Sequence, residues 1–241
     1  MQRIPIYCIN LDHRNDRWSV LQKQASTQKI DIVRFSAIKN SLFPHHGVAD
    51  SHRNIVEMAK INWYPFVCVL EDDVKLCKKF FKKLQETLTA APKDWHIIYL
   101  GWLVCRHAQI KKINKKISKI NGITCAYGII YSTKAYNNFM TTTEKTRFSN
   151  QKERKFNNFK TFDDWLAFDY QFKYPCYVSN KFLVKPMPSY SDIGKHYNGK
   201  IYGWVYSSRF LFYSNHLWWF LNLLWIFRDL IKQISIKLTK K

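Results

Sequence analysis

Three adjacent acidic residues follow the most apolar strand-like run of the chain. Residues Phe66 to Leu70 (FVCVL) predict a buried parallel strand, and Glu71, Asp72 and Asp73 come directly after it. Ligands of open α/β sheets bind beyond the carboxyl ends of the strands. Neighbouring carboxylates repel one another unless a cation is present, and Mn²⁺ and Mg²⁺ prefer oxygen ligands, commonly one or two carboxylates together with substrate phosphates. The run therefore predicts a Mn²⁺ or Mg²⁺ site that holds a diphosphate.

Strand periodicity divides these acids between two sides. Successive side chains of a strand point to opposite faces, so Glu71 and Asp73 share one side if the extended form persists. We assign Glu71 and Asp73 to the metal ion and Asp72 to the nucleotide. The alternative is an acidic group that only solvates a loop.

A second polar cluster follows the first predicted strand, which spans Ile4 to Leu11. In a nucleotide-binding α/β domain this turn meets the base, the ribose or the phosphates, and an arginine can hold a phosphate through two parallel hydrogen bonds. The alternative is turn chemistry in which Asn15 or Asp16 caps the first helix. The candidate nucleotide-binding residues here are Asn10, Asp12, Arg14 and Arg17.

Ser51 and His52 open the next predicted helix, which runs to about Asn62. A helix N-terminus attracts anions, so both residues are candidates for binding the nucleotide sugar. The alternatives are a helix cap for Ser51 and a buried, hydrogen-bonded imidazole for His52.

Predicted strands and helices alternate along the chain, as the positioning of these residues requires. Apolar runs predict strands at 4–11, 32–38, 66–70, 96–100 (ended by Gly101) and 124–131, and helical spacing predicts helices at 14–26, 51–62, 80–88, 133–142 and 162–172. This alternation favours a parallel sheet with helices on both faces. One or two short strands are expected within 177–184. The basic segment 106–120 is predicted to be a loop or flap, and 145–160 a loop.

Length and composition limit the class of protein. The 241 residues suit one α/β domain with a full core, and 46% apolar residues exclude a disordered chain. None of the six cysteines lies in a CxxC spacing, so we expect buried free thiols rather than a zinc site or disulfides. The apolar run at the N-terminus is too short for a signal peptide, which favours a cytoplasmic protein.

The net charge of +22 favours a polyanionic partner. Nucleic acid, an anionic membrane surface and a diphosphate all fit, and coding bias alone also produces such a charge. The basic residues are scattered and no nucleic-acid-binding motif occurs, so we expect no nucleic acid partner.

Residues 201–241 differ from the rest of the chain. Phe210 to Phe227 is nearly all apolar, with basic residues behind it, but it is short and interrupted for a transmembrane helix. Trp, Phe and Leu beside Lys suit a helix that lies in a membrane interface. The alternatives are a helix packed on the core or on another subunit, and a true span. We expect a basic, Trp/Leu-rich helical tail that holds the protein peripherally at an anionic membrane.

Four patches of the sequence occur in a fixed order. They are INLDHRNDRW (Ile9 to Trp18); RFSAI (Arg34 to Ile38) with GVADSH (Gly47 to His52); VLEDDV (Val69 to Val74); and AYGIIYSTKA (Ala126 to Ala135) with DDWL (Asp163 to Leu166) and SYSDIG (Ser189 to Gly194). Together they resemble glycosyltransferase family 25, the lipopolysaccharide and collagen glycosyltransferases. The stretch before Ser51 lacks the Glu and Cys expected near the glycine, and 106–120 and 195–241 match nothing in the family.

The resemblance implies a fold of class α/β, that of a GT-A type nucleotide-diphospho-sugar transferase. We expect a single Rossmann-like domain at 1–200 with a mostly parallel central sheet, followed by the helical tail. The resemblance also implies a UDP-sugar donor, usually UDP-galactose or UDP-glucose, and inversion at the anomeric carbon.

The resemblance adds two further roles. It favours Asp164, and then Asp163, as the base that takes the proton of the acceptor hydroxyl, against the alternative of acids that cap a helix. His196 would supply a third metal ligand, because GT-A enzymes often take a histidine from this region. The alternative for His196 is a surface loop.

These expectations describe an inverting, Mn²⁺- or Mg²⁺-assisted galactosyl- or glucosyltransferase. Its donor is a UDP-sugar, and its acceptor is a hydroxyl of a lipopolysaccharide-like or other surface glycan, including a lipid-linked glycan. Three alternatives remain: a catalytically inactive GT-A scaffold or binding module, a metal-dependent nucleotidyltransferase, and a basic nucleic-acid-binding protein.

Overall fold

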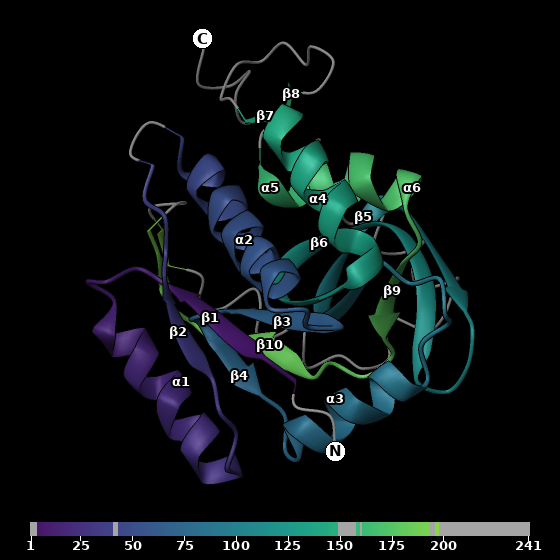
Figure 1. Cartoon of the computed structure of the whole chain (residues 1–241). Coiled ribbons are helices and arrows are strands. Elements are labelled where there is room, and N and C mark those ends of the chain that lie inside the picture. The colour runs from purple at the N-terminus through teal and green to yellow at the C-terminus, as the bar shows by residue number, and fades with distance from the viewer. Residues whose placement is uncertain (1–3, 41–42, 149–157, 160, 193–195, 198–241) are drawn as a thin grey trace, which may run out of the picture. The chain divides into compact units, whose positions relative to one another are not determined.

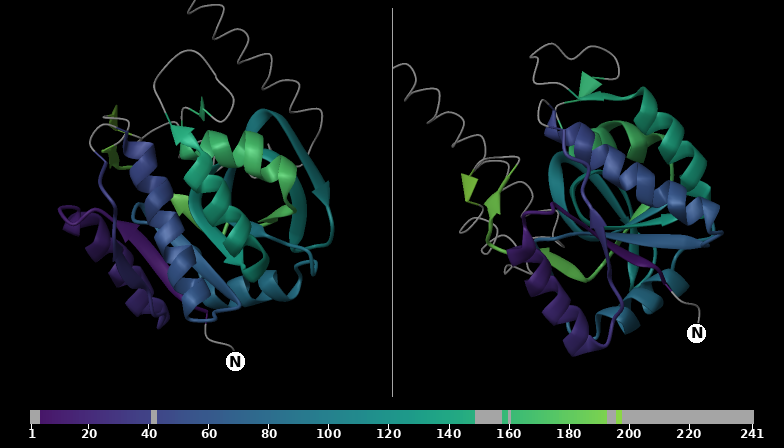
Figure 2. Two further views of the ribbon diagram at one scale, coloured as in Figure 1. Left: turned by 45° about the horizontal axis from the view of Figure 1, so that its top comes forward. Right: turned by 60° about the vertical axis from the view of Figure 1, so that its left-hand side comes forward.

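The computed structural model describes residues 4–40, 43–148, 158–159, 161–192 and 196–197. Within these ranges a six-stranded sheet carries helices on both faces, with α2 and α4 on one face and α1 and α3 on the other (Figures 1 and 2). The elements are β1 (Ile6–Asn10), α1 (Asn15–Gln28), β2 (Val33–Ser36), α2 (Pro44–Ile61), β3 (Phe66–Glu71), β4 (Val74–Leu76), α3 (Phe80–Thr89), β5 (Ile97–Lys112), β6 (Ile117–Ser132), α4 (Thr133–Lys145), β7 (Arg147–Phe148), β8 (Asn158–Phe159), α5 (Phe162–Trp165), the π-helical turn η1 (Leu166–Tyr170), α6 (Gln171–Lys173), β9 (Cys176–Ser179), β10 (Val184–Pro186), β11 (Tyr190–Ser191) and β12 (His196–Tyr197).

The central sheet has the strand order β2-β1-β3-β6-β5-β9. Strand β1 runs parallel to β2 and β3, and β9 runs parallel to β5. Strand β6 is antiparallel to both of its neighbours, β3 and β5. The predicted α/β class with a mostly parallel sheet is therefore confirmed, with β6 as the one reversed strand of this sheet.

The predicted loop or flap at 106–120 is wrong, and so is the predicted strand end at Gly101. Strands β5 and β6 form one long hairpin that runs through both regions. Antiparallel neighbours need only a short turn between them, and lysines on the solvent side obscured the alternation. Gly101 lies inside β5. A Cβ at this position would stand 2.5 Å from the Val184 carbonyl oxygen, so the close approach of the two backbones requires a glycine.

The β5–β6 hairpin curls back on the sheet. Strand β9 pairs with the start of β5 through Ile97 to Tyr99, and with the start of β6 through Ile117 to Ile120. The apolar residues of these segments are fully or almost fully buried, namely Ile97, Ile98, Tyr99, Ile117 and Ile120. The curl brings the far end of the hairpin back beside the segment that follows β9.

The core of the sheet contains thiols that make no disulfide. Cys8, Cys68, Cys125 and Cys176 are free and buried, and Cys77 is free and partly exposed. Among the described cysteine side chains, the prediction of free thiols is confirmed. On β3, Cys68 and Leu70 are fully buried, which anchors the strand that ends in the acidic residues.

Helix α2 begins earlier than predicted. It starts at Pro44, and proline is tolerated in a first helical turn because no N–H partner is needed there. Ser51 consequently lies in the middle of the helix, and the predicted cap is wrong. Its Oγ donates to the Gly47 carbonyl (2.7 Å) and accepts from the Ile38 N–H (2.8 Å), which ties the segment after β2 to α2.

The structure describes one predicted segment only in part and another not at all. The predicted loop at 145–160 contains the short parallel pair of β7 and β8. The predicted tail at 201–241 lies outside the described residues, so the boundary after residue 200 stays a prediction. Within the described ranges, no helix combines the length and the apolarity that crossing a membrane requires.

Gly47→Ala tests the close packing of α2. Alanine normally stabilises a helix by about 1 kcal/mol relative to glycine. Here a Cβ would stand 2.2 Å from the Ile38 carbonyl oxygen, so we expect a loss of about 1–3 kcal/mol in the free energy of unfolding. Urea denaturation measures it, with Gln22→Ala on the exposed side of α1 as control. A stabilised Gly47→Ala variant would contradict this packing.

Candidate active site

The acidic motif begins where β3 ends. Glu71 is the last residue of the strand, and Asp72 and Asp73 form the turn into β4. Because the extended form stops at Glu71, the period-two division of the three acids does not hold. Asp72 and Asp73 both face Arg17, with ion-pair distances of 2.7 Å and 3.6 Å respectively.

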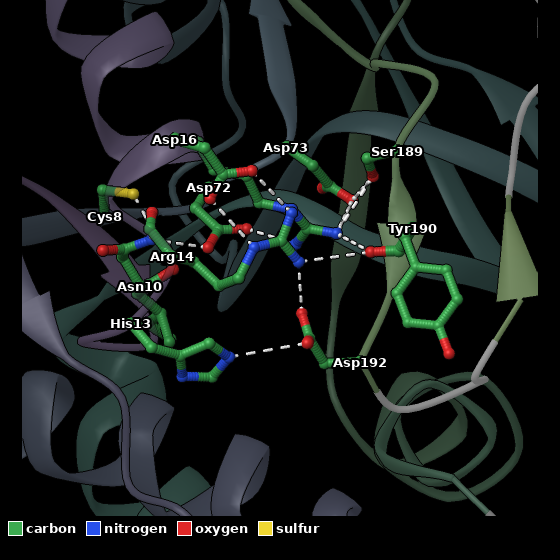
Figure 3. A network of polar contacts seen from close by, with 12 residues as sticks. Cys8, Asn10, His13, Arg14, Asp16, Asp72, Asp73, Ser189, Tyr190 and Asp192 are labelled. Atoms are coloured by element: carbon green, nitrogen blue, oxygen red, sulfur yellow. Dashed lines mark hydrogen bonds and ion pairs between the residues drawn. The ribbon is translucent and has the colours of Figure 1, made fainter.

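Asp72 is held by polar contacts from β1 and α1 (Figure 3). Its carboxylate accepts from the Asn10 Nδ2 at 2.7 Å and from the Arg17 Nη1 at 2.7 Å. Asn10, the last residue of β1, also donates to the Arg14 carbonyl and accepts from the Arg34 Nε. Asn10 is 1% exposed and Asp72 is 6% exposed. Asn10 therefore fixes Asp72 and the turn after β1 at the same time.

Asp73 has one satisfied and one unsatisfied oxygen. Its Oδ2 accepts from the Ser189 hydroxyl at 3.0 Å and lies 3.6 Å from the Arg17 guanidinium. Its Oδ1 is buried and has no hydrogen-bond partner among the described residues. Burial raises the pKa of Asp73, and the charge of Arg17 opposes this rise.

The two arginines of the first turn bind protein groups. Arg14 forms a two-bond contact with the Asp16 carboxylate (3.0 and 2.9 Å) and pairs with Asp192. Arg17 donates to the Tyr190 carbonyl at 2.6 Å and to the Ser189 hydroxyl at 3.0 Å. Together they fasten the segment after β10 to the acidic motif (Figure 3). Phosphate contact by Arg14 and Arg17 stays a prediction.

Asp163 and Asp164 are the two candidates for the catalytic base, and the charge of Asp163 acts on the acidic motif. Its charge is among the causes that raise the pKa of Glu71, after burial and Asp73. The Asp163 Oδ1 accepts from the Ala126 N–H at 3.1 Å. Burial raises the pKa of Asp163 to about 6, although this backbone contact lowers it. A carboxyl group of this kind exchanges its proton close to neutral pH.

Asp164 lies in the first turn of the same short helix but does not cap it. Thr161 is the cap, because its Oγ1 accepts from the Asp164 N–H at 3.0 Å. The first helix likewise lacks the expected cap by Asn15 or Asp16, since the capping position is Arg14 and makes no side-chain cap bond.

His52 does not join the acidic cluster described above. It lies within α2, where its Nδ1 hydrogen-bonds with the Tyr131 hydroxyl at 2.9 Å and its ring packs on Phe162 with centroids 4.8 Å apart. Burial lowers the pKa of His52 to about 3, so the imidazole is neutral. The predicted helix-terminal anion contact for Ser51 and His52 does not hold, because α2 begins at Pro44.

Two predicted residues remain, Asp12 and His196. Asp12 is exposed and accepts from the Ser36 hydroxyl. The His196 backbone pairs with Ser191 in the β11–β12 hairpin. That hairpin includes Tyr190, whose carbonyl binds Arg17, so the backbone of His196 belongs to the segment fastened to the motif. Metal binding by His196 stays a prediction.

Sequence reasoning missed three contributions to the site. Ser189 binds Asp73, and it stands in the SYSDIG patch, whose position beside the motif is a tertiary property. The Ala126 N–H binds Asp163, and Cys125 beside it adopts a left-handed backbone (φ 78°). Such a conformation is rare for a residue other than glycine, and the residue types of this strand do not encode it.

The acids fit a divalent cation only together with outside ligands. Within the part of the chain that the structure describes, no three His, Cys, Asp or Glu side chains gather closely enough to bind an ion. Glu71 and Asp73 still supply carboxylate oxygens: the charge of Asp73 raises the pKa of Glu71, and the Asp73 Oδ1 is buried without a donor among the described residues. One or two carboxylates with substrate phosphates are the usual ligand set of Mg²⁺, which this arrangement can supply.

Comparisons with known proteins give a match to one family and several distant structural similarities. Residues 45–161 match the family model described as glycosyltransferase family 25 (LPS biosynthesis protein). A comparison with curated protein sequences finds no match. The similar structures are a glycosyltransferase involved in the glycosylation of the major capsid of PBCV-1 (10% identity, 73% of this chain and 81% of that chain, TM-score 0.48), A197 from STIV (13%, 76% and 84%, 0.44) and mannose-1-phosphate geranyltransferase from Thermus thermophilus (8%, 60% and 64%, 0.35).

The similarities to these structures are too distant to support an argument about chemistry. The assignment therefore rests on the family match. It covers α2, the acidic motif and the β5–β6 hairpin, and ends at the cap of α5. The mixed α/β sheet agrees with the GT-A class that the resemblance implies. Residues 45–161 thus match glycosyltransferase family 25, and this match supports a glycosyltransferase activity for the chain.

Proposed function

We propose that the chain transfers galactose or glucose from a UDP-sugar, with inversion, to a hydroxyl of a lipopolysaccharide-like surface glycan. Mn²⁺ or Mg²⁺ would assist at Glu71 and Asp73, and Asp163 would act as the base. A bound cation would stabilise the negative charge that develops on the departing nucleoside diphosphate. The proposal rests on the family match and on the acids that follow β3, where the charges of Asp73 and Asp163 raise the pKa of Glu71.

The metal assignment is supported by an excess of buried negative charge. Burial raises the pKa of Glu71 well above its ordinary value, and the carboxylates of Asp73, Asp163 and Asp72 raise it further. Arg17 neutralises part of this charge, mainly through Asp72. A divalent cation beside Glu71 and Asp73 would favour their ionised forms. His196 remains the proposed third ligand.

Asp163 is a better candidate for the base than Asp164. A base for the acceptor hydroxyl must be deprotonated near neutral pH and yet hold a proton well enough to take it. The pKa of about 6 at Asp163 meets both requirements. Its contact with the Ala126 N–H fixes the direction of the carboxylate, and its charge acts on Glu71.

The donor would be bound by the segments around the motif. Asn10 and Asp72, fixed to each other at 2.7 Å, stand where a nucleotide would meet the ends of β1 and β3. Arg17 would orient Asp72, and both Arg14 and Arg17 could exchange their protein contacts for phosphate oxygens when a donor binds. Asp12 would contact the nucleotide from the outer part of the turn.

The acceptor is proposed from the description of the family as LPS biosynthesis proteins. A lipid-linked glycan acceptor would bring the enzyme to a membrane from the cytoplasmic side. The basic, Trp/Leu-rich sequence at 201–241 supports peripheral attachment by its composition.

Release of UDP from a panel of UDP-sugars tests the donor and the motif together. We expect slow, Mn²⁺-dependent hydrolysis of UDP-galactose or UDP-glucose, reduced on the order of a hundredfold in Asp73→Asn. Asp50→Asn, which removes a surface carboxylate that pairs with nearby Arg53, is the matched control. No release from any donor, together with no thermal stabilisation by UDP plus Mn²⁺, would contradict the proposal.

The stability of Asp163→Asn as a function of pH tests the environment of the base. The folded state raises the pKa of Asp163 from 3.8 to about 6, so between these values the folded chain binds the proton that the unfolded chain releases. The contribution of Asp163 to the free energy of unfolding therefore falls as pH rises through that window and is constant above it. Asp163→Asn should gain about 2 kcal/mol over wild type between pH 4 and pH 7, as measured by urea denaturation.

The matched control for this measurement is Asp164→Asn, which leaves the Asp163 carboxyl in place. Parallel stability curves for wild type and Asp163→Asn would contradict the assigned environment. Below pH 6 the rate of transfer by the wild type should also fall, because the base becomes protonated.

A further inference from the structure

The β5–β6 hairpin carries a charge pattern that glycosyl transfer does not explain. Its end, residues 110–119, reads IKKINKKISK, with five lysines and no acid. All five lysines are exposed. Ile110 and Ile113 are also exposed, by 39% and 43%. Cations and bare aliphatic side chains therefore share one end of the molecule.

The hairpin end is held rigidly. The Asn114 Nδ2 donates to the Ala90 carbonyl at the end of α3 (2.9 Å), and its Oδ1 accepts from the Lys116 and Ile117 N–H groups. The Asn180 Nδ2 donates to the Asn114 carbonyl at 2.9 Å, and its N–H donates to the Lys116 carbonyl at 2.8 Å. The hairpin end thus lies against α3, as Figure 1 shows. The lysines project from a fixed frame rather than from a free loop.

The neighbouring surface extends the positive charge. Glu86 on α3 pairs with Lys116, and Lys116, Lys82 and Lys181 all lower the pKa of this carboxyl group. This acid beside the hairpin end is therefore already neutralised. A shallow, mainly apolar depression lies between α3 and Lys116, with Phe81 and Ala90 in its lining.

We propose that this surface, formed by residues 110–119 with Lys82 and Lys181, docks on an anionic lipid bilayer. Lysines next to anionic headgroups are attracted at short range. Aliphatic side chains between them enter the boundary between headgroups and acyl chains, while the lysine stems reach back to the phosphates. The rigid frame presents both kinds of side chain together. This surface lies apart from the acidic motif in sequence, and the proposal does not depend on the donor, the metal or the tail.

A lipid surface fits the side chains of the hairpin end better than nucleic acid does. Single-stranded nucleic acid is bound by aromatic side chains that stack on bases, often with arginine. Residues 110–119 contain neither aromatic residues nor arginine. Exposed isoleucines gain nothing from a phosphodiester backbone, whereas they gain from an apolar interior.

Vesicle flotation of the full chain tests this surface. The vesicles contain phosphatidylcholine with phosphatidylglycerol, or phosphatidylcholine alone. Lys112→Glu/Lys115→Glu should weaken binding to the anionic vesicles by about tenfold or more, because each lysine near an anionic surface contributes about fivefold. Ile110→Ser/Ile113→Ser should also weaken binding, and this loss should persist at high salt.

The matched control is Lys23→Glu/Lys60→Glu, which makes the same change of net charge at exposed positions of α1 and α2. Ile61→Ser controls for loss of an exposed isoleucine. Thermal melting checks the fold, and Lys112→Gln/Lys115→Gln replaces the charge reversal if that variant melts early.

Weaker binding to the anionic vesicles in the hairpin variants, but not in the control variants, would support the proposal. Equal losses in hairpin and control variants, no binding of the wild type to anionic vesicles, or equal binding to both vesicle types would overturn it. Loss of binding to single-stranded DNA with unchanged vesicle binding would also overturn it, and would assign the surface to a nucleic acid.

Discussion

The charge balance between Arg17 and the acids after β3 is the interaction on which the site depends. Arg17, in the first turn of α1, lies 2.7 Å from Asp72 and 3.6 Å from Asp73, and all three side chains are largely buried. Removing one partner of a buried pair typically costs about 3–5 kcal/mol, because the other charge stays buried without compensation. This contact fixes α1 against the end of β3, while Asn10 fixes β1 to the same carboxylate. The spacing of the two strand ends follows from these bonds.

The guanidinium of Arg17 also holds the segment that follows β10, which is distant in the sequence. Its Nη2 donates to the Tyr190 carbonyl and the Ser189 hydroxyl, and Ser189 in turn binds Asp73. A site assembled in this way is preorganised, since its dipoles need little rearrangement when charge arrives. Two atoms of this network are buried without a hydrogen-bond partner among the described residues, the Asp73 Oδ1 and the Arg17 Nε. A ligand that brings positive charge would supply the missing partner of the Asp73 Oδ1.

The sequence predicted the local elements of the site better than their contacts. The buried strand before Glu71, the helix after Arg14 and the helix at Asp163 follow from apolar spacing, because burial acts through local periodicity. The direction of β6, the hairpin through 106–120 and the early start of α2 at Pro44 depend on strand pairing and packing, which no local pattern specifies. For the same reason the effect of the Asp163 charge on Glu71, and the partners of Arg14 and Arg17, became visible only in three dimensions.

The central claim is that a divalent cation and a nucleoside diphosphate meet at the acids after β3. Anomalous diffraction from crystals grown with UDP and Mn²⁺ tests it most directly, because the manganese signal identifies its own ligands. We expect one manganese peak, coordinated by Asp73 or Glu71 and by phosphate oxygens of UDP. UDP bound elsewhere, or UDP bound at this motif with no manganese beside either carboxylate, would contradict it.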